Sequence, residues 1–285
     1  VDKTEYDICL INGEGSIHHS QPRALSLARL IKKIKDDSKQ VFVINATIQD
    51  NNEYILNALR LVDKIFVRES MSLNYLKVNY IDAVVVPDMS FHAEFNYHNN
   101  KRRFGFGVTD SVYDEVSIKF LNLSGNKVAF MPILRRPDLE IKNWLSLIRI
   151  IKYRLMVCFW RVVPLNRNRR FYVTKRIFYY ASSYDEYIEN VSNVNKAVIS
   201  RFHTLCFAIK TRTPFVAVPS NTYKIQGLLE DVGITGSRVM QVANIDDGIF
   251  DSICEFNSAE LTAIKKYVDE ARGRIEDMFD TIFGR

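Results

Sequence analysis

The sequence predicts an α/β fold with two doubly wound halves around a cleft, and three observations support this prediction. Short, β-branched apolar runs alternate with stretches of helical apolar spacing along the chain. A polar, asparagine-rich stretch without periodicity, residues 92–103, separates two such series. Several of the short runs end in charged residues, as expected at the carboxyl ends of parallel strands, where α/β proteins bind ligands.

The first half, residues 1–95, is predicted to hold four strands connected by helices. The strands are expected at residues 6–11, 41–44, 64–67 and 84–86. The helices are expected at residues 24–34, 53–61 and 71–76. Pro22 and Ser70 mark the starts of the first and third helix, because proline suits the first helical position and a serine hydroxyl can cap free N–H groups.

The second half, residues 103–285, repeats the alternation. Its strands are expected at residues 103–108, 127–131, 171–173, 197–200 and 215–218. Its helices are expected at residues 114–121, 139–158, 184–191, 221–229 and 258–283, and a helical pattern also follows His203. The last helix is amphipathic, with Ser258 as its candidate cap, and part of it is expected to complete the first half.

The composition is that of an ordinary globular protein with one local excess of charge. The chain has 285 residues, of which 47% are hydrophobic and 25% charged, and its net charge is +6. Residues 135–176 hold twelve Lys and Arg but only Asp138 and Glu140 as acids. This indicates an anionic partner near that segment, whereas the balanced charges elsewhere exclude a general nucleic-acid binder. Four widely spaced cysteines without a C-x-x-C pair indicate reduced thiols in a cytoplasmic protein.

Within the basic segment, residues 141–176, the stretch 141–163 carries an apolar stripe flanked by basic residues if it is helical. A basic amphipathic helix can lie on an anionic membrane surface. Alternatively, the stripe faces the core and the basic side faces water. Charges interrupt the stretch too often for a helix that spans a membrane.

The predicted turn after the first strand, residues 12–16, places a carboxylate between two glycines. Gly13 and Gly15 let a ligand approach the backbone closely, and a helix beyond them offers its positive end to an anion. Glu14 stands at the carboxyl end of the strand, where it can act as a general base. In the alternative interpretation, Glu14 only caps the helix. The spacing is not G-x-G-x-x-G, so no dinucleotide site is inferred.

Three more polar residues lie in this turn or close behind it. Asn12 is its first residue, and His18 and His19 follow it closely enough to contact a bound substrate. The alternative is that both histidines are exposed to solvent. Adjacent histidines rarely point at one ion, so no metal site is expected.

Arg68 and Asp88 follow the third and fourth predicted strands. An arginine beside a cleft can clamp a carboxylate or phosphate with two hydrogen bonds. Alternatively, Arg68 pairs with Glu69 on the surface. Asp88 can orient a substrate hydroxyl, or it can cap the first turn of the linker.

Arg201 and His203 follow the predicted strand at 197–200. Two residues apart in an extended segment, they are expected to face the same way. A guanidinium and an imidazole on one face suit a phosphate or carboxylate, and the imidazole can also transfer a proton. Lys224, at the next strand–helix junction, can join them on the same anion. A buried structural histidine and a solvated lysine are the alternatives.

Five segments in this order resemble the polysaccharide pyruvyl transferase family. They are residues 7–16, 66–70, 86–91, 198–204 and 214–233. The resemblance implies a GT-B-like fold, with two Rossmann-type domains around a cleft. It also implies transfer of a pyruvyl group from phosphoenolpyruvate to a hydroxyl pair of a surface polysaccharide or its lipid-linked precursor. Arg201 and His203 would then hold the donor's phosphate and carboxylate and supply a proton.

The chain also departs from this family. The family begins with a strand and a glycine- and acid-containing turn, and this element is either absent before Tyr6 or not included in the sequence. The family also more often has three glycines where this chain has Gly13, Glu14 and Gly15. A GT-B glycosyltransferase with a nucleotide-sugar donor and a lipid-linked acceptor, and an inactive glycan-binding domain, are therefore kept as alternatives. In each case no resident cofactor is expected. The enzyme is expected in the cytoplasm, at the inner face of the membrane if the basic segment binds lipid.

Overall fold

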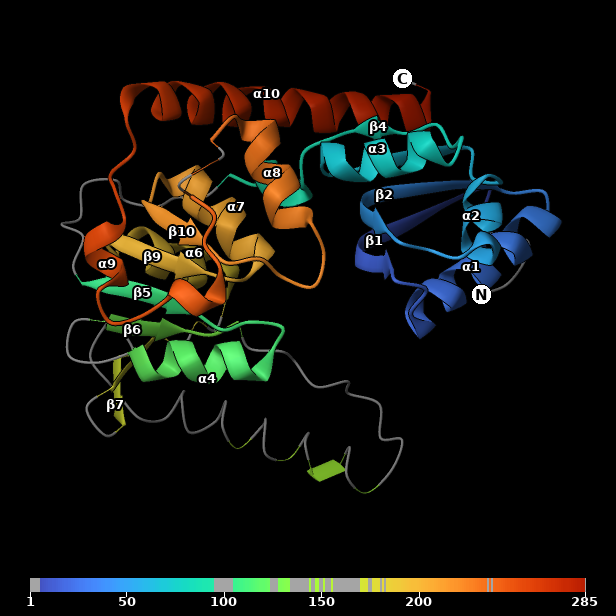
Figure 1. Cartoon of the computed structure of the whole chain (residues 1–285). Coiled ribbons are helices and arrows are strands. Elements are labelled where there is room, and N and C mark those ends of the chain that lie inside the picture. The colour runs from blue at the N-terminus through green and yellow to red at the C-terminus, as the bar shows by residue number, and fades with distance from the viewer. Residues whose placement is uncertain are drawn as a thin grey trace.

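The computed structural model describes most of the chain outside the basic segment. The described residues are 6–94, 105–123, 128–133, 144, 147, 148, 151, 155, 170–173, 176–179, 181, 183–234, 236 and 238–284. They form two β-sheets covered by helices, with the long C-terminal helix running along the top of both (Figure 1). Most of the expected linker 92–103 and of the expected helix 139–158 lies outside these residues.

The first sheet is parallel and follows the order of the sequence, β1-β2-β3-β4. Its strands are β1 (Ile8–His18), β2 (Gln40–Gln49), β3 (Lys64–Val67) and β4 (Val84–Val85). The helices between them are α1 (Pro22–Asp36), α2 (Glu53–Leu59) and α3 (Ser70–Val78), and the short η1 (Met89–Phe91) follows β4.

The second sheet has the order β10-β9-β5-β6-β8-β7, and only β7 runs antiparallel to its neighbour. Its strands are β5 (Phe106–Thr109), β6 (Val128–Met131), β7 (Arg170–Val173), β8 (Arg176–Tyr179), β9 (Lys196–Ile199) and β10 (Phe215–Ala217). Strands β6, β8 and β7 lie on one side of β5, and the later strands β9 and β10 lie on its other side. The strand order therefore reverses between β5 and β9.

Helices on both faces cover the second sheet. They are α4 (Asp114–Leu123), α6 (Tyr184–Ser192), α7 (Phe202–Thr211), α8 (Lys224–Val232), the short η2 (Val242–Asn244) and α9 (Ile249–Ser252), and α10 (Ser258–Phe283) ends the chain. The sequence did not predict β8, η1, η2 or α9. The α/β class and the GT-B-like layout are confirmed.

Strand β1 does not end at Ile11 as expected but continues to His18 through a bulge. A Cβ on Gly13 would lie 2.7 Å from the Cβ of Ala46, so glycine allows β1 and β2 to stay paired there. Glu14 has a φ of 40°, and on β2 Asn45 has a φ of 55°. The predicted turn is thus a pair of facing irregularities inside two long strands, which propensity alone does not reveal.

Two caps differ from the prediction because an earlier side chain reaches the free N–H groups. Glu69, not Ser70, caps α3 by accepting from Ser72 N at 2.8 Å. Asn257, not Ser258, caps α10, and together with Glu260 it forms a capping box.

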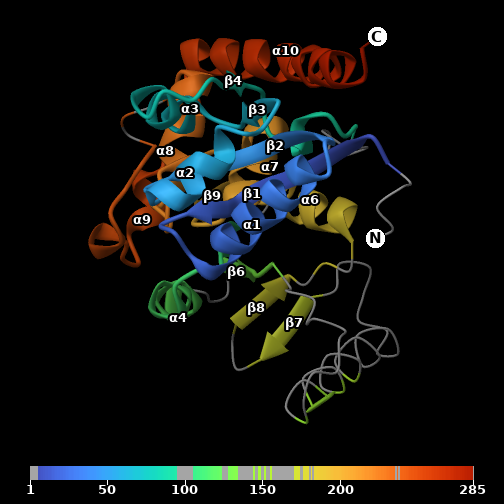
Figure 2. The ribbon, with the colours of Figure 1, turned by 90° about the vertical axis from the view of Figure 1, so that its right-hand side faces the viewer.

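The core is shared between the halves. Outward residues of the first sheet, such as Val43 and Ile65, pack on α1 and α2, which lie over that face in Figure 2. The inner face, through Phe66, joins one cluster with Ile225 of α8 and Ile275 of α10. The C-terminal helix therefore covers part of the first half as well as the second.

Candidate active site

The site begins where the strand order of the second sheet reverses. β5 is followed by Asp110, and β9 is followed by Ser200 and Arg201. Open α/β sheets bind ligands outside the carboxyl ends of the strands at such a reversal. Arg201 Nε donates to Asp110 Oδ2 over 3.0 Å, so a carboxylate from the neighbouring strand holds this guanidinium in place.

Arg201 and His203 do not share one face of an extended segment, so that expectation is wrong. Helix α7 already begins at Phe202, and Arg201 is its N-cap residue. The side chains diverge as a result. Arg201 binds Asp110 within its own half, whereas His203 Nε2 lies 3.8 Å from Asp88 Oδ2 of the first half.

Arg68, after β3, is a fully buried cation at the junction of the halves, 2% exposed. Its Nε donates to Thr47 Oγ1 at 2.8 Å and its Nη1 to Asp88 Oδ2 at 3.0 Å. The guanidinium also lies over the ring of Phe202, 4.0 Å from the ring centre. No acceptor for its Nη2 is found among the described residues. Arg68 does not form the surface pair with Glu69 that was the alternative.

Asp88 and His203 form a coupled pair beside Arg68. Burial opposes ionisation of Asp88, but Arg68, His203 and hydrogen bonds from Ser90 outweigh it and lower the pKa of this carboxyl. Burial, opposed by Asp88 and Glu14, lowers the pKa of His203 below its usual value. The imidazole is therefore neutral at neutral pH, next to an ionised carboxylate that can orient it.

Lys224 is a second buried cation in this region, and it opens α8. Burial, then the charges of Arg68 and Arg201, lower its pKa to about 8. A Cβ on Gly15 would lie 3.5 Å from Arg68 Nη2 and 3.6 Å from Lys224 Nζ. The bare backbone of Gly15 thus leaves both cations uncovered on that side, which suits an anion.

The carboxylate of Glu14 is exposed at the edge of this region. Asn12 Nδ2 donates to Glu14 Oε1 at 3.3 Å, and Asn12 Oδ1 accepts from Asn45 across the two bulges. The charge of Glu14 opposes the lowering of the His203 pKa, and it adds to burial and to the charge of Asp88 in raising the pKa of Tyr184. Glu14 does not cap α1, because the N-cap residue of that helix is Gln21.

The two histidines that follow β1's bulge both contact Asn221 of the second half. His18 is buried and its Nε2 lies 3.4 Å from Asn221 Nδ2. His19 is partly exposed, with Nε2 3.1 Å from the Asn221 carbonyl oxygen and Nδ1 3.4 Å from Asp50. Within the described part of the chain, no three His, Cys, Asp or Glu side chains are placed to hold a metal ion.

Five of the predicted residues thus meet between the halves, and we call them the interdomain site: Gly15, Arg68, Asp88, His203 and Lys224. Glu14, His18 and His19 border it, Arg201 lies at the strand reversal, and Asn12 and Gly13 shape the bulge. Sequence reasoning missed three polar partners: Thr47, Asp110 and Asn221. Of these, Asp110 and Asn221 carried a signal, because each closely follows a predicted strand.

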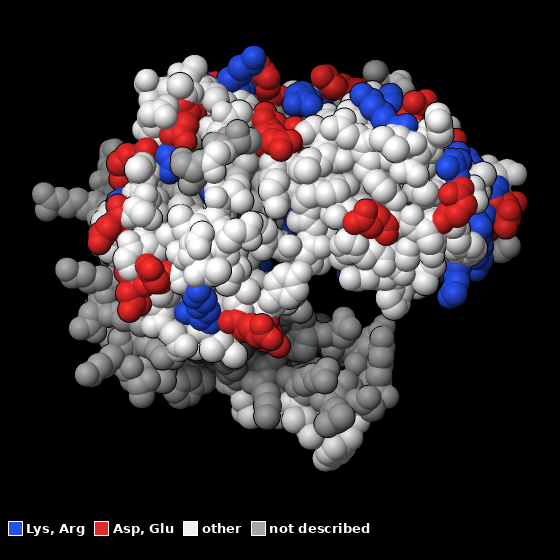
Figure 3. Space-filling view, in the orientation of Figure 1, with Lys and Arg blue, Asp and Glu red and all other residues white. Residues whose placement is uncertain are grey.

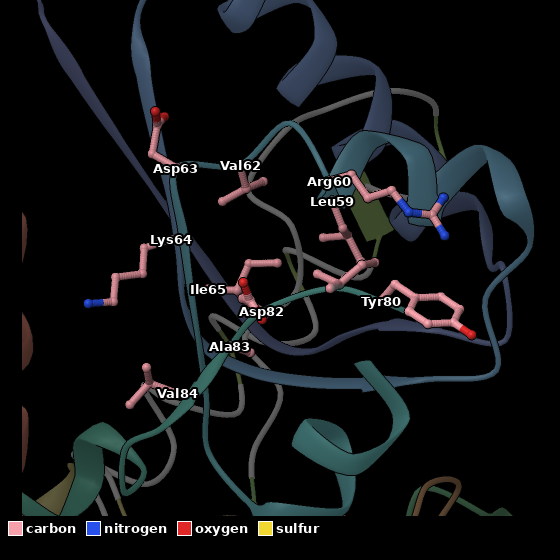
Figure 4. Close-up of a pocket in the computed structure, with 11 residues that line it drawn as sticks. Leu59, Arg60, Val62, Asp63, Lys64, Ile65, Tyr80, Asp82, Ala83 and Val84 are labelled. Carbon is pink, nitrogen blue, oxygen red and sulfur yellow. The ribbon is translucent and has the colours of Figure 1, made fainter. Parts of the chain in front are cut away.

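A separate pocket lies at the opposite end of the first sheet. Its volume is about 310 Å³, and its lining includes Asp63, Lys64, Tyr80 and Val84 (Figure 4). Lys64 begins β3, whereas Arg68 follows the end of that strand. The pocket is therefore remote from the interdomain site and contributes nothing to it.

Apart from β7 and the first residue of β8, the basic segment is described at five helical positions. Three of its apolar side chains are exposed: Trp144 by 73%, Ile151 by 46% and Leu155 by 64%. At these positions the core-facing interpretation is wrong. None of the helices formed by the described residues has the length and apolarity needed to cross a membrane. On the face drawn in Figure 3, described acidic and basic side chains are mixed, and both signs occur along the top.

The protein has a GT-B-like fold, with buried cations and a neutral imidazole between its two Rossmann-type halves. A protein from Listeria monocytogenes described as a UDP-N-acetylglucosamine 2-epimerase matches 98% of this chain and 75% of its own, with a TM-score of 0.52 and 9% identity. A trehalose-6-phosphate synthase matches 99% of this chain and 75% of its own, with a TM-score of 0.50 and 9% identity. At such identities the likeness concerns the fold.

A sequence profile of the polysaccharide pyruvyl transferase family matches residues 2–222. The chain therefore belongs to the polysaccharide pyruvyl transferase family, which confirms the resemblance. It is a transferase, and its acceptor is a glycan. None of the curated proteins matches the sequence.

Proposed function

We propose that the protein transfers a pyruvyl group from phosphoenolpyruvate to a pair of hydroxyl groups on a glycan sugar. One observation carries the proposal: Arg68 Nη2 and Lys224 Nζ lie against the bare backbone of Gly15, beside a neutral His203. Phosphoenolpyruvate presents a carboxylate and a phosphate on one small unit. Two buried cations on one side of a glycine match that pattern of charge.

We assign the donor's two anionic groups to Arg68 and Lys224, with Arg201 adding positive potential from the strand reversal. Arg201 is coupled to the site, since its charge helps lower the pKa of Lys224. The family resemblance assigns Arg201 and His203 to the donor as well. Asp88 keeps Arg68 and His203 in place and is not itself assigned to the substrate.

In the proposed reaction, C3 of phosphoenolpyruvate gains a proton and both hydroxyl oxygens bond to C2. The bond between C2 and the phosphate oxygen breaks, and inorganic phosphate leaves. Of the two hydroxyl protons, one balances the proton taken up by C3 and the other leaves with phosphate. His203, unprotonated at neutral pH, accepts a hydroxyl proton and returns it to C3, and Glu14 is assigned as the second base.

A nucleotide-sugar donor is the second candidate, and the exposed carboxylate of Glu14 is the observation that favours it. A carboxylate at the edge of the site can deprotonate an acceptor hydroxyl without any need for pyruvyl chemistry. In that reaction the nucleotide phosphates take the place of the donor anion beside Lys224.

A donor screen tests the choice. We expect phosphoenolpyruvate to raise the thermal unfolding temperature of the protein, and nucleoside mono- and diphosphates to leave it unchanged. With a glycan acceptor, release of inorganic phosphate should require phosphoenolpyruvate. His203→Asn should lower kcat by about 100-fold or more while phosphoenolpyruvate still binds, because loss of a general base affects the chemical step. Stabilisation by nucleotides alone would reject the pyruvyl donor.

We further propose that the acceptor is lipid-linked and that the enzyme meets it at the inner face of a membrane. Exposed Trp144, Ile151 and Leu155 are spaced by seven and four residues, so they lie on one helical face. The surrounding sequence, residues 135–176, is strongly basic. An apolar stripe among basic residues supports contact with anionic lipid.

A flotation experiment with phosphatidylglycerol vesicles tests this contact, and the protein should float with the vesicles. The double variant Trp144→Ser, Leu155→Ser should no longer float.

A further inference from the structure

The segment that leads from β10 into α8 is fixed by the first half of the protein. Tyr223 N donates to Gln49 Oε1 at 3.0 Å, and Tyr223 Oη donates to the Ile48 carbonyl oxygen at 2.5 Å. The Asn221 carbonyl oxygen lies 3.1 Å from His19 Nε2. Lys224, which belongs to the second half, therefore takes its position from contacts with strands of the first.

Within this segment the side chain of Asn221 lies between Lys224 and His18. Its Oδ1 accepts from Lys224 Nζ at 3.0 Å and from Ser220 Oγ at 3.2 Å. Its Nδ2 lies 3.4 Å from His18 Nε2. An ammonium can only donate, so the amide oxygen must point toward Lys224 and the amide N–H groups toward His18.

This orientation requires an unprotonated Nε2 on His18. Burial, His19 and Lys224 lower the pKa of His18, opposed by the backbone of Gly15, so the imidazole is neutral at neutral pH. The charged groups that act on Lys224 are Arg68 and Arg201, and no carboxylate is paired with it among the described residues. The Asn221 oxygen is thus its hydrogen-bond acceptor in this part of the structure.

We propose that Asn221 is a positioning residue that holds Lys224 in place for the donor anion, with its amide oriented by His18 from the other half. The inference rests on the proposed function, because it takes Lys224 as an anion-binding group. It adds that the anion site is complete only when the two halves are docked. Asn221 itself need not touch the substrate.

Binding of inorganic phosphate and of phosphoenolpyruvate, measured by calorimetry, tests this without relying on turnover. Asn221→Leu should weaken binding about tenfold, as expected for loss of a hydrogen bond to a charged group. His18→Phe should weaken it less, and should have no further effect in the Asn221→Leu background, because His18 acts through Asn221. Thermal unfolding of each variant checks that it is folded.

A pH profile gives a second readout that a purely structural role would not change. In the unmodified protein, anion affinity should fall as the pH rises through about 8, where Lys224 loses its proton. Asn221→Asp places a carboxylate against the ammonium, so this midpoint should move to higher pH. An unmoved midpoint together with additive effects of His18→Phe and Asn221→Leu would overturn the positioning role. If the unmodified protein binds neither anion, the proposed function falls with it.

Discussion

Lys224 is the residue at which stability and function oppose each other most directly. Its side chain is 8% exposed, and among the described residues no carboxylate neutralises it. A buried charge without a counter-charge destabilises the folded state. Residues with strongly shifted pKa values between domains are typical of functional sites. Burial and the charges of Arg68 and Arg201 lower the pKa of Lys224 to about 8, and this uncompensated charge supports its proposed role in binding an anion.

Lys224→Met should raise stability and abolish donor binding. The free energy of unfolding should rise by up to about 3 kcal/mol at pH 7, because the pKa of Lys224 shifts from 10.5 to about 8 on folding. Since the folded-state pKa is lowered, the destabilisation by this charge is fully present below pH 8 and disappears as the pH rises toward 10.5. Thermal unfolding and calorimetry with phosphoenolpyruvate measure the two effects.

Lys210→Met is the matched control. Its pKa is also lowered to about 8, but its Nζ donates to the carbonyl oxygens of Ser90, at 3.3 Å, and Phe91, at 3.1 Å. Loss of these contacts should offset the gain from removing a buried charge, so stability should rise less than in Lys224→Met, and donor binding should stay intact. A destabilised Lys224→Met variant that still binds phosphoenolpyruvate would show that Lys224 is structural.

At the scale of elements, the paired bulges of β1 and β2 position most of the glycine-rich segment. The extra residue at Asn45 changes which side chains of β2 face outward, so Val43 before it and Ala46 after it pack on the same face. Thr47 then faces inward, where it accepts from Arg68. The irregular strands thus connect the outer core to the cation of the interdomain site.

Two glycines of β1 should respond differently to alanine. Gly13→Ala should destabilise the protein by about 1–3 kcal/mol, because its Cβ would lie 2.7 Å from the Cβ of Ala46 in the paired strand. Gly15→Ala should leave stability nearly unchanged, since its nearest contacts would be 3.5 and 3.6 Å, but it should weaken phosphoenolpyruvate binding by covering Arg68 and Lys224. Urea unfolding and calorimetry separate the two. Equal losses of stability would contradict this division.

Local pattern predicted the regular elements well and the site only in part. The strand at 64–67 and the helix at 258–283 have their predicted bounds, because apolar periodicity and burial agree there. The bulge at Glu14 was missed, since it depends on the backbone of β2. Asn221 was missed for a similar reason: its partners His18 and Lys224 become neighbours only after the halves dock.

At the scale of the whole molecule, the halves are joined by a packed and partly acidic interface beside the site. Ser70 N of α3 donates to Asp231 Oδ2 of α8 at 3.0 Å. A Cβ on Gly227 would lie 2.7 Å from Glu69 Oε2, so α8 packs directly on this buried carboxyl. Glu69 adjoins Arg68 in sequence. Packing at the interface, through Glu69, is therefore linked to the position of the buried Arg68 guanidinium, because the two residues are consecutive.

Glu69→Gln should change how stability depends on pH. Burial, only partly offset by Ser72 and Arg68 and assisted by Asp231, raises the pKa of Glu69 from 4.5 to about 7. Because the folded-state pKa of this carboxyl is raised, the protein loses stability as the pH rises from about 4.5 to 7, and the loss is complete above 7. Relative to the unmodified protein, the variant should gain up to about 3 kcal/mol over that window and then level off. The amide still accepts from Ser72 N, so the cap of α3 is kept.

Glu270→Gln, on the exposed side of α10, is the control and should show no such gain. Urea unfolding at a series of pH values measures the free energy of unfolding of both variants. If Glu69→Gln shows the same pH dependence as the control, the Glu69 carboxyl does not contribute to the stability of the interface.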